Sequence, residues 1–162
     1  MLPELQLQQT NRPMCVVQHW LETDSLELSP PYQRGDVWGY KRRVNFIRSL
    51  LMGVPIPSVI INDRLSADFI GDKPQHYAVI DGKQRLTTIK MFVKGTLLVP
   101  GEWFDLGYRL ASFDNLSRSQ QRRFENHPMP FSEGRLKTIE REQEVFELVN
   151  FGGLRQGEVD AE

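Results

Sequence analysis

The chain has 162 residues, of which 40% are hydrophobic and 25% charged, and its net charge is −1. These values are typical of one globular domain, which at this length folds without a disulfide or a structural metal. The single cysteine, Cys15, excludes an intramolecular disulfide. Apolar runs are too short for a membrane span and the N-terminus is unlike a leader peptide, so we expect a cytoplasmic protein with no membrane partner.

Charge is distributed unevenly along the chain. Residues 140–162 contain seven acidic and two basic residues, so the first 139 residues carry a net charge of +4. Basic residues cluster in two places, and the candidates for contact with nucleic-acid phosphates are Lys41, Arg42, Arg48, Arg122 and Arg123. Basic residues on solvated helices explain the same pattern, so charge alone leaves the choice open.

Apolar periodicity predicts helices and strands that alternate along the chain. Apolar residues recur at helical spacing from Tyr40 to Leu51, and Gly53 provides a helix stop. Continuous β-branched and apolar runs at 59–61 and 77–80 are typical of buried strands. The predicted helices are 14–22, 40–52, 82–94, 117–126 and 139–150, and the predicted strands are 26–28, 59–61, 77–80 and 97–99.

These elements predict one compact α+β domain over residues 13–158, with a small mixed sheet surrounded by helices. Residues 1–12 are polar and flanked by proline, so we expect a flexible N-terminal arm. Residues 159–162 are expected to form an acidic tail. Cys15 falls on the apolar face of the first predicted helix, which predicts a core position.

The segment 81–85, Asp-Gly-Lys-Gln-Arg, follows a predicted buried strand and opens a predicted helix. The N-terminus of a helix has unpaired backbone N–H groups and a partial positive charge, which together suit a phosphate. A glycine here lets the backbone approach a ligand, and an arginine can donate two hydrogen bonds to phosphate oxygens. The candidate ligand contacts in this region are Gly82, Lys83, Gln84, Arg85, Thr87 and Thr88.

A structural interpretation of the same segment is equally consistent with the residues. Asp81 and Gln84 have the spacing of a capping box, which stabilises a helix start by about 1 kcal/mol. Arg85 then extends to solvent.

A second candidate segment precedes the first predicted long helix. The prolines at 30–31 hold the backbone extended and Gly35 allows it to change direction, so Gln33 and Arg34 lie on a stiff turn. In the alternative interpretation this is an ordinary loop in which Trp38 covers the core. The sequence contains no Walker A loop, dinucleotide glycine motif, serine-nucleophile elbow or spaced set of metal ligands.

Four motifs occur in order along the chain: Tyr32-Gln33-Arg34-x-x-x-Trp38, Ser49-Leu50-Leu51-x-Gly53-x-Pro55-Ile56-Pro57, Val79-Ile80-Asp81-Gly82-Lys83-Gln84-Arg85-Leu86-Thr87-Thr88 and Val145-Phe146-x-x-x-Asn150-x-Gly152-Gly153. Together they resemble the N-terminal domain of GmrSD-type, modification-dependent restriction enzymes, whose hallmark is Asp-Gly-Gln-Gln-Arg. That domain is similar in fold to the ParB and sulfiredoxin nucleotide-binding domains. The resemblance extends over residues 14–158.

The resemblance implies a nucleoside-triphosphate-binding domain that hydrolyses or senses nucleotide. Our leading hypothesis is a slow phosphohydrolase with Mg²⁺ as cofactor, in which Asp81 or a nearby carboxylate coordinates the metal or orients water. In the restriction enzymes this activity gates cleavage of modified DNA by a separate HNH nuclease domain. The implied catalytic residues are Asp81, Gln84 and Arg85, and the implied nucleotide- or phosphate-binding residues are Gln33, Arg34, Gly82, Lys83, Arg85, Thr87, Thr88 and Asn150. Lys83 departs from the hallmark, and the 162 residues contain no HNH cluster, so cleavage itself is not implied.

Two alternatives stay open. The chain is a DNA-binding or ParB-like adaptor that does not hydrolyse nucleotide, or a phage- or defence-associated interaction protein that keeps only the fold. The expected partners are a nucleotide, DNA, and a separate nuclease or defence-system protein. For the leading hypothesis, we expect Arg85→Ala to abolish nucleotide binding with little change in thermal stability.

Overall fold

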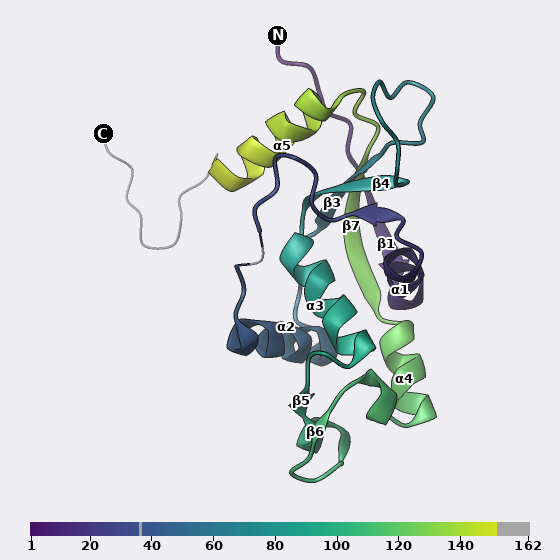
Figure 1. Ribbon diagram of the computed structural model, residues 1–162, viewed down its shortest axis with the longest axis vertical. Helices are drawn as coiled ribbons and strands as arrows, with labels where there is room; N and C mark the ends of the chain where they lie inside the picture. Colours follow the sequence, from purple (N-terminus) through teal and green to yellow (C-terminus); the bar gives the residue numbers. More distant parts are fainter. Residues whose placement is uncertain (36, 152–162) are drawn as a thin grey trace, which may run out of the picture.

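The computed structural model describes residues 1–35 and 37–151 (Figure 1). The helices are α1 (Met14–Glu22), α2 (Tyr40–Met52), α3 (Lys83–Lys94), α4 (Arg118–Glu125) and α5 (Ile139–Phe151), with two 3-10 helices, η1 (Gly101–Phe104) and η2 (Phe113–Asn115). The strands are β1 (Gln8–Pro13), β2 (Leu26–Glu27), β3 (Val59–Asp63), β4 (Tyr77–Asp81), β5 (Val99–Pro100), β6 (Leu110–Ala111) and β7 (Pro128–Gly134). Within the described ranges, no helix has the length and apolar character needed to cross a membrane.

Five strands form a mixed sheet in the order β1-β7-β3-β4-β2. β1 is antiparallel to β7 and β3 to β4, whereas β7–β3 and β4–β2 are parallel pairs. β5 and β6 form a separate antiparallel pair. The predicted α+β class, with a small mixed sheet among helices, is therefore confirmed.

Both faces of the sheet are covered, because successive side chains of a strand point to opposite sides. Val79 belongs to the main core, which also contains buried residues of α1, α2 and α3. Its neighbour Ile80 belongs to a smaller core with Val145 and Phe146 of α5. In Figure 1, α5 accordingly lies apart from the other helices, beside β4. The end of β4 is thus flanked by α5 on one face and α3 on the other.

Glycines define the ends of the two central helices. α2 ends at Gly53, whose φ is 74°, and α3 begins at Gly82, whose φ is 108°. A Cβ atom added at Gly82 would lie 2.9 Å from the side chain of Val59 on β3. Residue 82 therefore needs glycine both for its backbone conformation and for close packing of the β4–α3 turn.

The structure differs from the sequence predictions at the N-terminus and at β7. Residues 8–13 form an edge strand rather than part of a flexible arm, and Thr10 and Arg12 contact Glu133 of β7. The alternating apolar signal is absent from β1 because this edge strand is largely polar. β7 was missed because it carries prolines at 128 and 130, which argue against a strand. Cys15 is exposed, so its predicted core position is wrong.

Candidate functional site

The β4–α3 turn lies in a cleft of about 190 Å³, which we call the motif cleft. Its walls come from three segments that are distant in sequence: the loop after β2, the turn itself and the C-terminal part of α5. The lining residues are Gln33, Arg34, Val37, Trp38, Asp81, Gly82, Lys83, Gln84, Arg85, Phe146 and Asn150. All the predicted catalytic and nucleotide-binding residues except Thr87 and Thr88 are thus brought together.

The first turn of α3 has no side-chain cap. Gly82 is the N-cap residue, and among the described residues no side chain accepts a cap hydrogen bond from the backbone N–H groups of this turn. The capping-box interpretation of Asp81 and Gln84 is therefore wrong. Since an uncapped helix start has unpaired N–H groups and a partial positive charge, this turn retains the property that favours an anion.

Arg85 is 9% exposed and braces the wall of the cleft. Its Nη2 donates to Asp81 Oδ2 at 3.1 Å, and its Nη1 donates to the backbone oxygen of Pro57. Burial lowers the pKa of the guanidinium, and the carboxylate of Asp81 offsets part of that effect. The interpretation in which Arg85 extends to solvent is wrong. Removing this side chain leaves the Asp81 carboxylate and a carbonyl without their donor, so a loss of stability is expected as well.

Two glutamine side chains hold the loop after β2 against the turn. Gln33 Nε2 donates to the backbone oxygens of Val79, at 2.9 Å, and of Ile80, at 2.7 Å. Gln84 Nε2 donates to the backbone oxygen of Gly35 at 3.2 Å, while its Oε1 accepts from backbone N–H groups of residues 37 and 38. Their amides are occupied by backbone partners, so both residues shape the cleft.

The positive charge that faces the opening comes from Lys83 and Arg34. Lys83 Nζ donates to Ser29 Oγ and to the backbone oxygen of Arg34, both at 2.8 Å. An ammonium group has three donors, so one is left for a ligand. The side chain of Arg34 is exposed and makes no hydrogen bond or ion pair with the described residues. These two groups are available to an anion, unlike Arg85.

Aromatic side chains border the same cleft. Trp38 is half-buried, its ring lies edge-on to Phe46 at 5.8 Å, and the Arg42 guanidinium lies 4.8 Å from its centroid. Phe146 lines the cleft from α5. Asn150 lies beside it, and its Nδ2 donates to the backbone oxygen of Phe146 at 2.8 Å. The cleft therefore combines cationic groups with apolar rings.

Thr87 and Thr88 do not line the cleft. Thr88 is buried, donating to the backbone oxygen of Gln84 and accepting from Arg43 Nη1, both at 2.7 Å. Arg43 is only 4% exposed, because it connects α2 to α3. It is therefore not part of the surface basic cluster to which its sequence neighbours belong.

A buried network behind the cleft was missed by the sequence analysis. The Glu142 side chain of α5 is fully buried and accepts from Tyr32 Oη at 2.9 Å, Asn62 Nδ2 at 2.9 Å and Arg64 Nη2 at 2.7 Å. Arg64 also pairs with Glu27. Burial, then the neighbouring Glu142 carboxylate, raises the pKa of Tyr32 far above its usual value. No local pattern links residues 110 positions apart, so the sequence offered no signal for this network.

The candidate nucleic-acid contacts are all exposed. Lys41, Arg42 and Arg48 lie on α2, and Arg122 and Arg123 lie on α4. Arg48 and Arg123 line a second, larger cavity of about 470 Å³ between these helices and η1. The structure thus brings one member of each basic cluster to a common hollow.

Among the described residues that line the motif cleft, Asp81 is the one acidic residue. No set of three or more His, Cys, Asp or Glu side chains suitable for a metal occurs in residues 1–35 and 37–151. Mg²⁺ is commonly held by one or two carboxylates together with substrate phosphates and water. Asp81, whose second oxygen makes no hydrogen bond with the described residues, fits that mode of binding.

Comparison with known proteins agrees with the motifs gathered in the cleft. The family model described as the GmrSD restriction endonuclease, N-terminal domain, matches residues 17–160. No curated protein matches the chain. The matched region includes each segment that lines the motif cleft, and it covers most of the sequence. The chain therefore belongs to the GmrSD restriction endonuclease N-terminal domain family.

Proposed function

We propose that this domain binds a nucleoside triphosphate in the motif cleft and hydrolyses it slowly, as the nucleotide-responsive module of a restriction system. The observation that carries the proposal is the uncapped start of α3, which faces a cleft that also contains Lys83 and the unpaired side chain of Arg34. Backbone N–H groups, an ammonium and a guanidinium directed at one small volume favour phosphate over neutral ligands.

The phosphate groups lie against the β4–α3 turn in this proposal. Gly82 leaves space for them because it has no side chain, and its backbone conformation directs the following N–H groups into the cleft. Lys83 contributes its remaining donor, and Arg34 closes over the phosphates from the opposite loop. Of the four charged groups among the described lining residues, three are basic, which favours the approach of an anion.

The volume of about 190 Å³ suits the phosphate groups better than a whole nucleotide. The base therefore extends to the border of the cleft, where Trp38 and Phe146 provide apolar faces. Stacking of a base on an aromatic ring contributes about 1–3 kcal/mol and discriminates little between bases. We accordingly expect weak selectivity among the four nucleotides.

Mg²⁺, when bound, would neutralise phosphate charge and activate water, and Asp81 is the residue that would hold it. Asp81 keeps one oxygen free while Arg85 binds the other, which fixes the orientation of the carboxylate. Gln33 and Gln84 act as positioning residues, because their amides hold the loop through backbone contacts. Since Asp81 is the one carboxylate among the described lining residues, slow turnover is the expected outcome. A separate nuclease or defence protein is the partner that such a module would control.

Thermal stabilisation by ATP, GTP, CTP and UTP, each with and without Mg²⁺, tests this proposal. A ligand that binds only the folded state raises the free energy of unfolding by RT ln(1 + [L]/Kd), so the unfolding temperature rises with ligand concentration. We expect a shift for the wild type that is lost in Arg34→Gln and Lys83→Gln. Arg118→Gln, a change at an exposed residue at the start of α4, is the matched control and should keep the shift.

Arg34→Gln is the most informative variant because this side chain has no partner among the described residues. Its loss should weaken binding about tenfold or more while leaving the unliganded unfolding temperature unchanged. Wild-type affinity in both Arg34→Gln and Lys83→Gln would overturn the assignment of the phosphates to this cleft. Release of inorganic phosphate by the wild type, and its loss in Asp81→Asn, then tests hydrolysis separately.

A further inference from the structure

The larger cavity lies between α2, η1 and α4 and shares no lining residue with the motif cleft. We call it the α2–α4 cavity. Its volume of about 470 Å³ is within the range of small-molecule sites. The lining residues are Arg48, Leu50, Leu51, Met52, Trp103, Phe104, Asp105, Gln120, Arg123, Phe124 and His127. The proposed function does not use this cavity, although Leu50 and Leu51 of the second motif line it.

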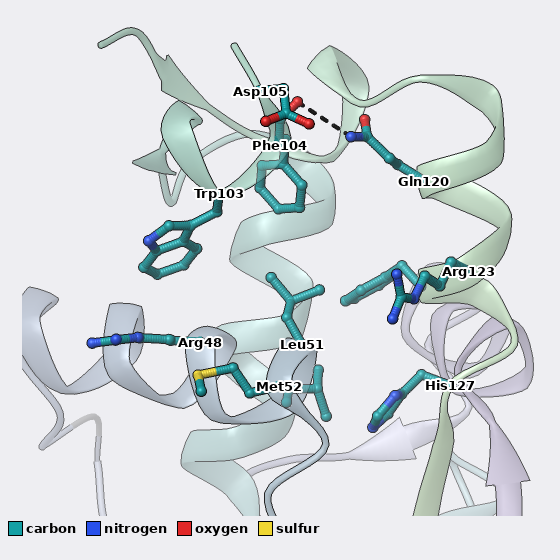
Figure 2. A pocket seen from close by; sticks show the side chains of 11 residues that line it. Arg48, Leu51, Met52, Trp103, Phe104, Asp105, Gln120, Arg123 and His127 are labelled. Carbon is teal, nitrogen blue, oxygen red and sulfur yellow. Dashed lines mark hydrogen bonds between the residues drawn. The ribbon is translucent and has the colours of Figure 1, made fainter. Parts of the chain in front are cut away.

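Polar and apolar groups line the α2–α4 cavity in similar measure, and part of its apolar side is aromatic. Leu50 and Phe124 are buried at its base, and Phe104 and the half-buried Trp103 come from η1. Figure 2 shows Phe104 above Leu51, with Trp103 to one side of them. Such walls favour a ligand that carries a flat apolar group.

Two cations border this cavity. Arg48 comes from α2 and Arg123 from α4, and Figure 2 shows them on opposite sides of the cavity. Both are exposed, and neither makes a hydrogen bond or ion pair with the described residues. His127 lies on the same side as Arg123, and burial lowers the pKa of its imidazole. Two unpaired guanidiniums beside aromatic walls favour a ligand that is anionic as well as flat.

Asp105 adds a hydrogen-bond acceptor to this set. Its backbone has a φ of 59°, an uncommon conformation for a residue other than glycine, and its carboxylate has no partner among the described residues. Gln120, by contrast, is occupied, because its Nε2 donates to the backbone oxygen of Phe104 at 3.2 Å and its Oε1 accepts from Ser117 N at 2.8 Å. A free carboxylate beside aromatic walls can accept from the exocyclic amino group of a base.

We propose that the α2–α4 cavity binds a single nucleotide unit, with the base against Trp103 and Phe104 and the phosphate held by Arg123. Asp105 then favours cytosine over thymine, because only cytosine offers an amino group at that edge. A free mononucleotide and a nucleotide unstacked from a single DNA strand share this chemistry. The proposal does not depend on the function of the motif cleft.

The three tryptophans allow the two sites to be distinguished in one experiment. Trp103 lines the α2–α4 cavity, Trp38 lines the motif cleft and Trp20 is in the core. Each indole N–H gives its own signal in a proton–nitrogen correlation spectrum, which tryptophan-to-phenylalanine variants assign. The full chain is titrated with dCMP, with dTMP, with a single strand of about ten deoxycytidines and with an abasic strand of the same length.

We expect the Trp103 signal to shift on titration with a cytosine ligand, with dTMP and the abasic strand at least about tenfold weaker. A shift with dCMP alone identifies a free nucleotide as the source, whereas a shift with the oligomer alone identifies a nucleotide within a strand. Arg123→Gln should weaken the interaction about tenfold. Arg118→Gln is the matched control, since this exposed residue at the start of α4 does not line the cavity, and it should leave the affinity within about twofold.

Three outcomes would overturn the proposal. The Trp103 signal fails to move with any ligand, the abasic strand moves it as readily as the cytosine strand, or Arg118→Gln and Arg123→Gln weaken binding equally. Signals that move only at Trp38 also overturn it while supporting the motif cleft. Conversely, a Trp103 shift that persists in Arg34→Gln supports this cavity even if the motif cleft binds no nucleotide.

Discussion

Two polar clusters meet near the end of β4, and they differ in how completely their groups are paired. The network around Glu142 is closed: the acid is fully buried, and tyrosine, asparagine and arginine side chains all donate to it. The motif cleft is open: Lys83 keeps a donor, Arg34 has no described partner and the start of α3 is uncapped.

The difference separates two roles for polar residues that lie close together. A buried charge whose hydrogen bonds are complete has nothing left for a ligand, so it can only fix the position of its neighbours. Tyr32 connects the two clusters, because it donates to Glu142 and immediately precedes Gln33 and Arg34 of the cleft. The closed network thus anchors the loop from which the open cleft presents its free arginine.

The largest expected effect comes from Glu142→Ala. Removing the acid leaves Arg64, whose side chain is 2% exposed, with Glu27 as its remaining carboxylate partner. We expect the free energy of unfolding to fall by about 3–5 kcal/mol, measured by urea denaturation. Glu144→Ala is the control: it removes an exposed ion pair with Arg141 on the same helix and should cost less than about 1 kcal/mol. Equal losses in the two variants would contradict the closed character of the network.

Gly82→Ala tests the turn that supports the open cleft. The backbone φ of 108° and the 2.9 Å approach to Val59 both oppose a Cβ atom at this position. We expect the free energy of unfolding to fall by about 2 kcal/mol. Because part of this loss is a clash with Val59, the double variant Gly82→Ala/Val59→Ala should lose less than the sum of the two single variants, and the difference measures the steric part. Gly39→Ala, at the N-cap of α2 with a φ of −83° and no described atom within 4 Å of an added Cβ, is the control; it should cost at most about 1 kcal/mol, the penalty for a poorer N-cap residue.

Arg85→Ala and Arg34→Ala compare a braced arginine with a free one inside the same cleft. Arg85→Ala should lower the free energy of unfolding by about 1–3 kcal/mol, because it leaves the Asp81 carboxylate and the Pro57 carbonyl without their donor. Arg34→Ala should leave stability within about 0.5 kcal/mol of wild type and lose nucleotide affinity. Thermal unfolding with and without nucleotide measures both, and the reverse pattern would contradict the assigned roles.

Local signals were sufficient for the elements that form the turn. Gly53 and Gly82 define helix ends, and the β-branched run at 59–61 predicts a buried strand, because each depends on residues within a few positions. The family motifs likewise predicted which residues gather in the cleft. Their separate roles were not predictable, since a motif does not reveal that Arg85 is braced by Pro57 while Arg34 stays free.

Features that depend on distant contacts escaped the sequence analysis. Arg43 is in a run of basic residues typical of a solvated helix face, yet it is buried because Thr88 of α3 lies opposite. Glu142 is in a glutamate-rich helix with the same appearance, and its contacts with Tyr32, Asn62 of β3 and Arg64 distinguish it from its exposed neighbours. The sequence around a charged residue predicts the helix to which it belongs, whereas the burial of its side chain depends on the element packed against that helix.

The smallest expected effect is the titration of His127, which extends the comparison to the α2–α4 cavity. Burial lowers the pKa of this imidazole below 6.5, so folding favours the neutral ring. The contribution of the neutral ring to the free energy of unfolding is therefore fully present above pH 6.5 and is lost as the pH falls through the folded-state pKa. Proton NMR of the ring should give a midpoint below 6.5 in the free protein. Binding of an anion beside Arg123 should raise that midpoint, because a nearby negative charge stabilises the imidazolium. A midpoint at or above the ordinary value in the free protein would mean that the ring already pairs with an anionic group. The polar groups of the α2–α4 cavity would then be paired, as in the Glu142 network, rather than available to a ligand, as in the motif cleft.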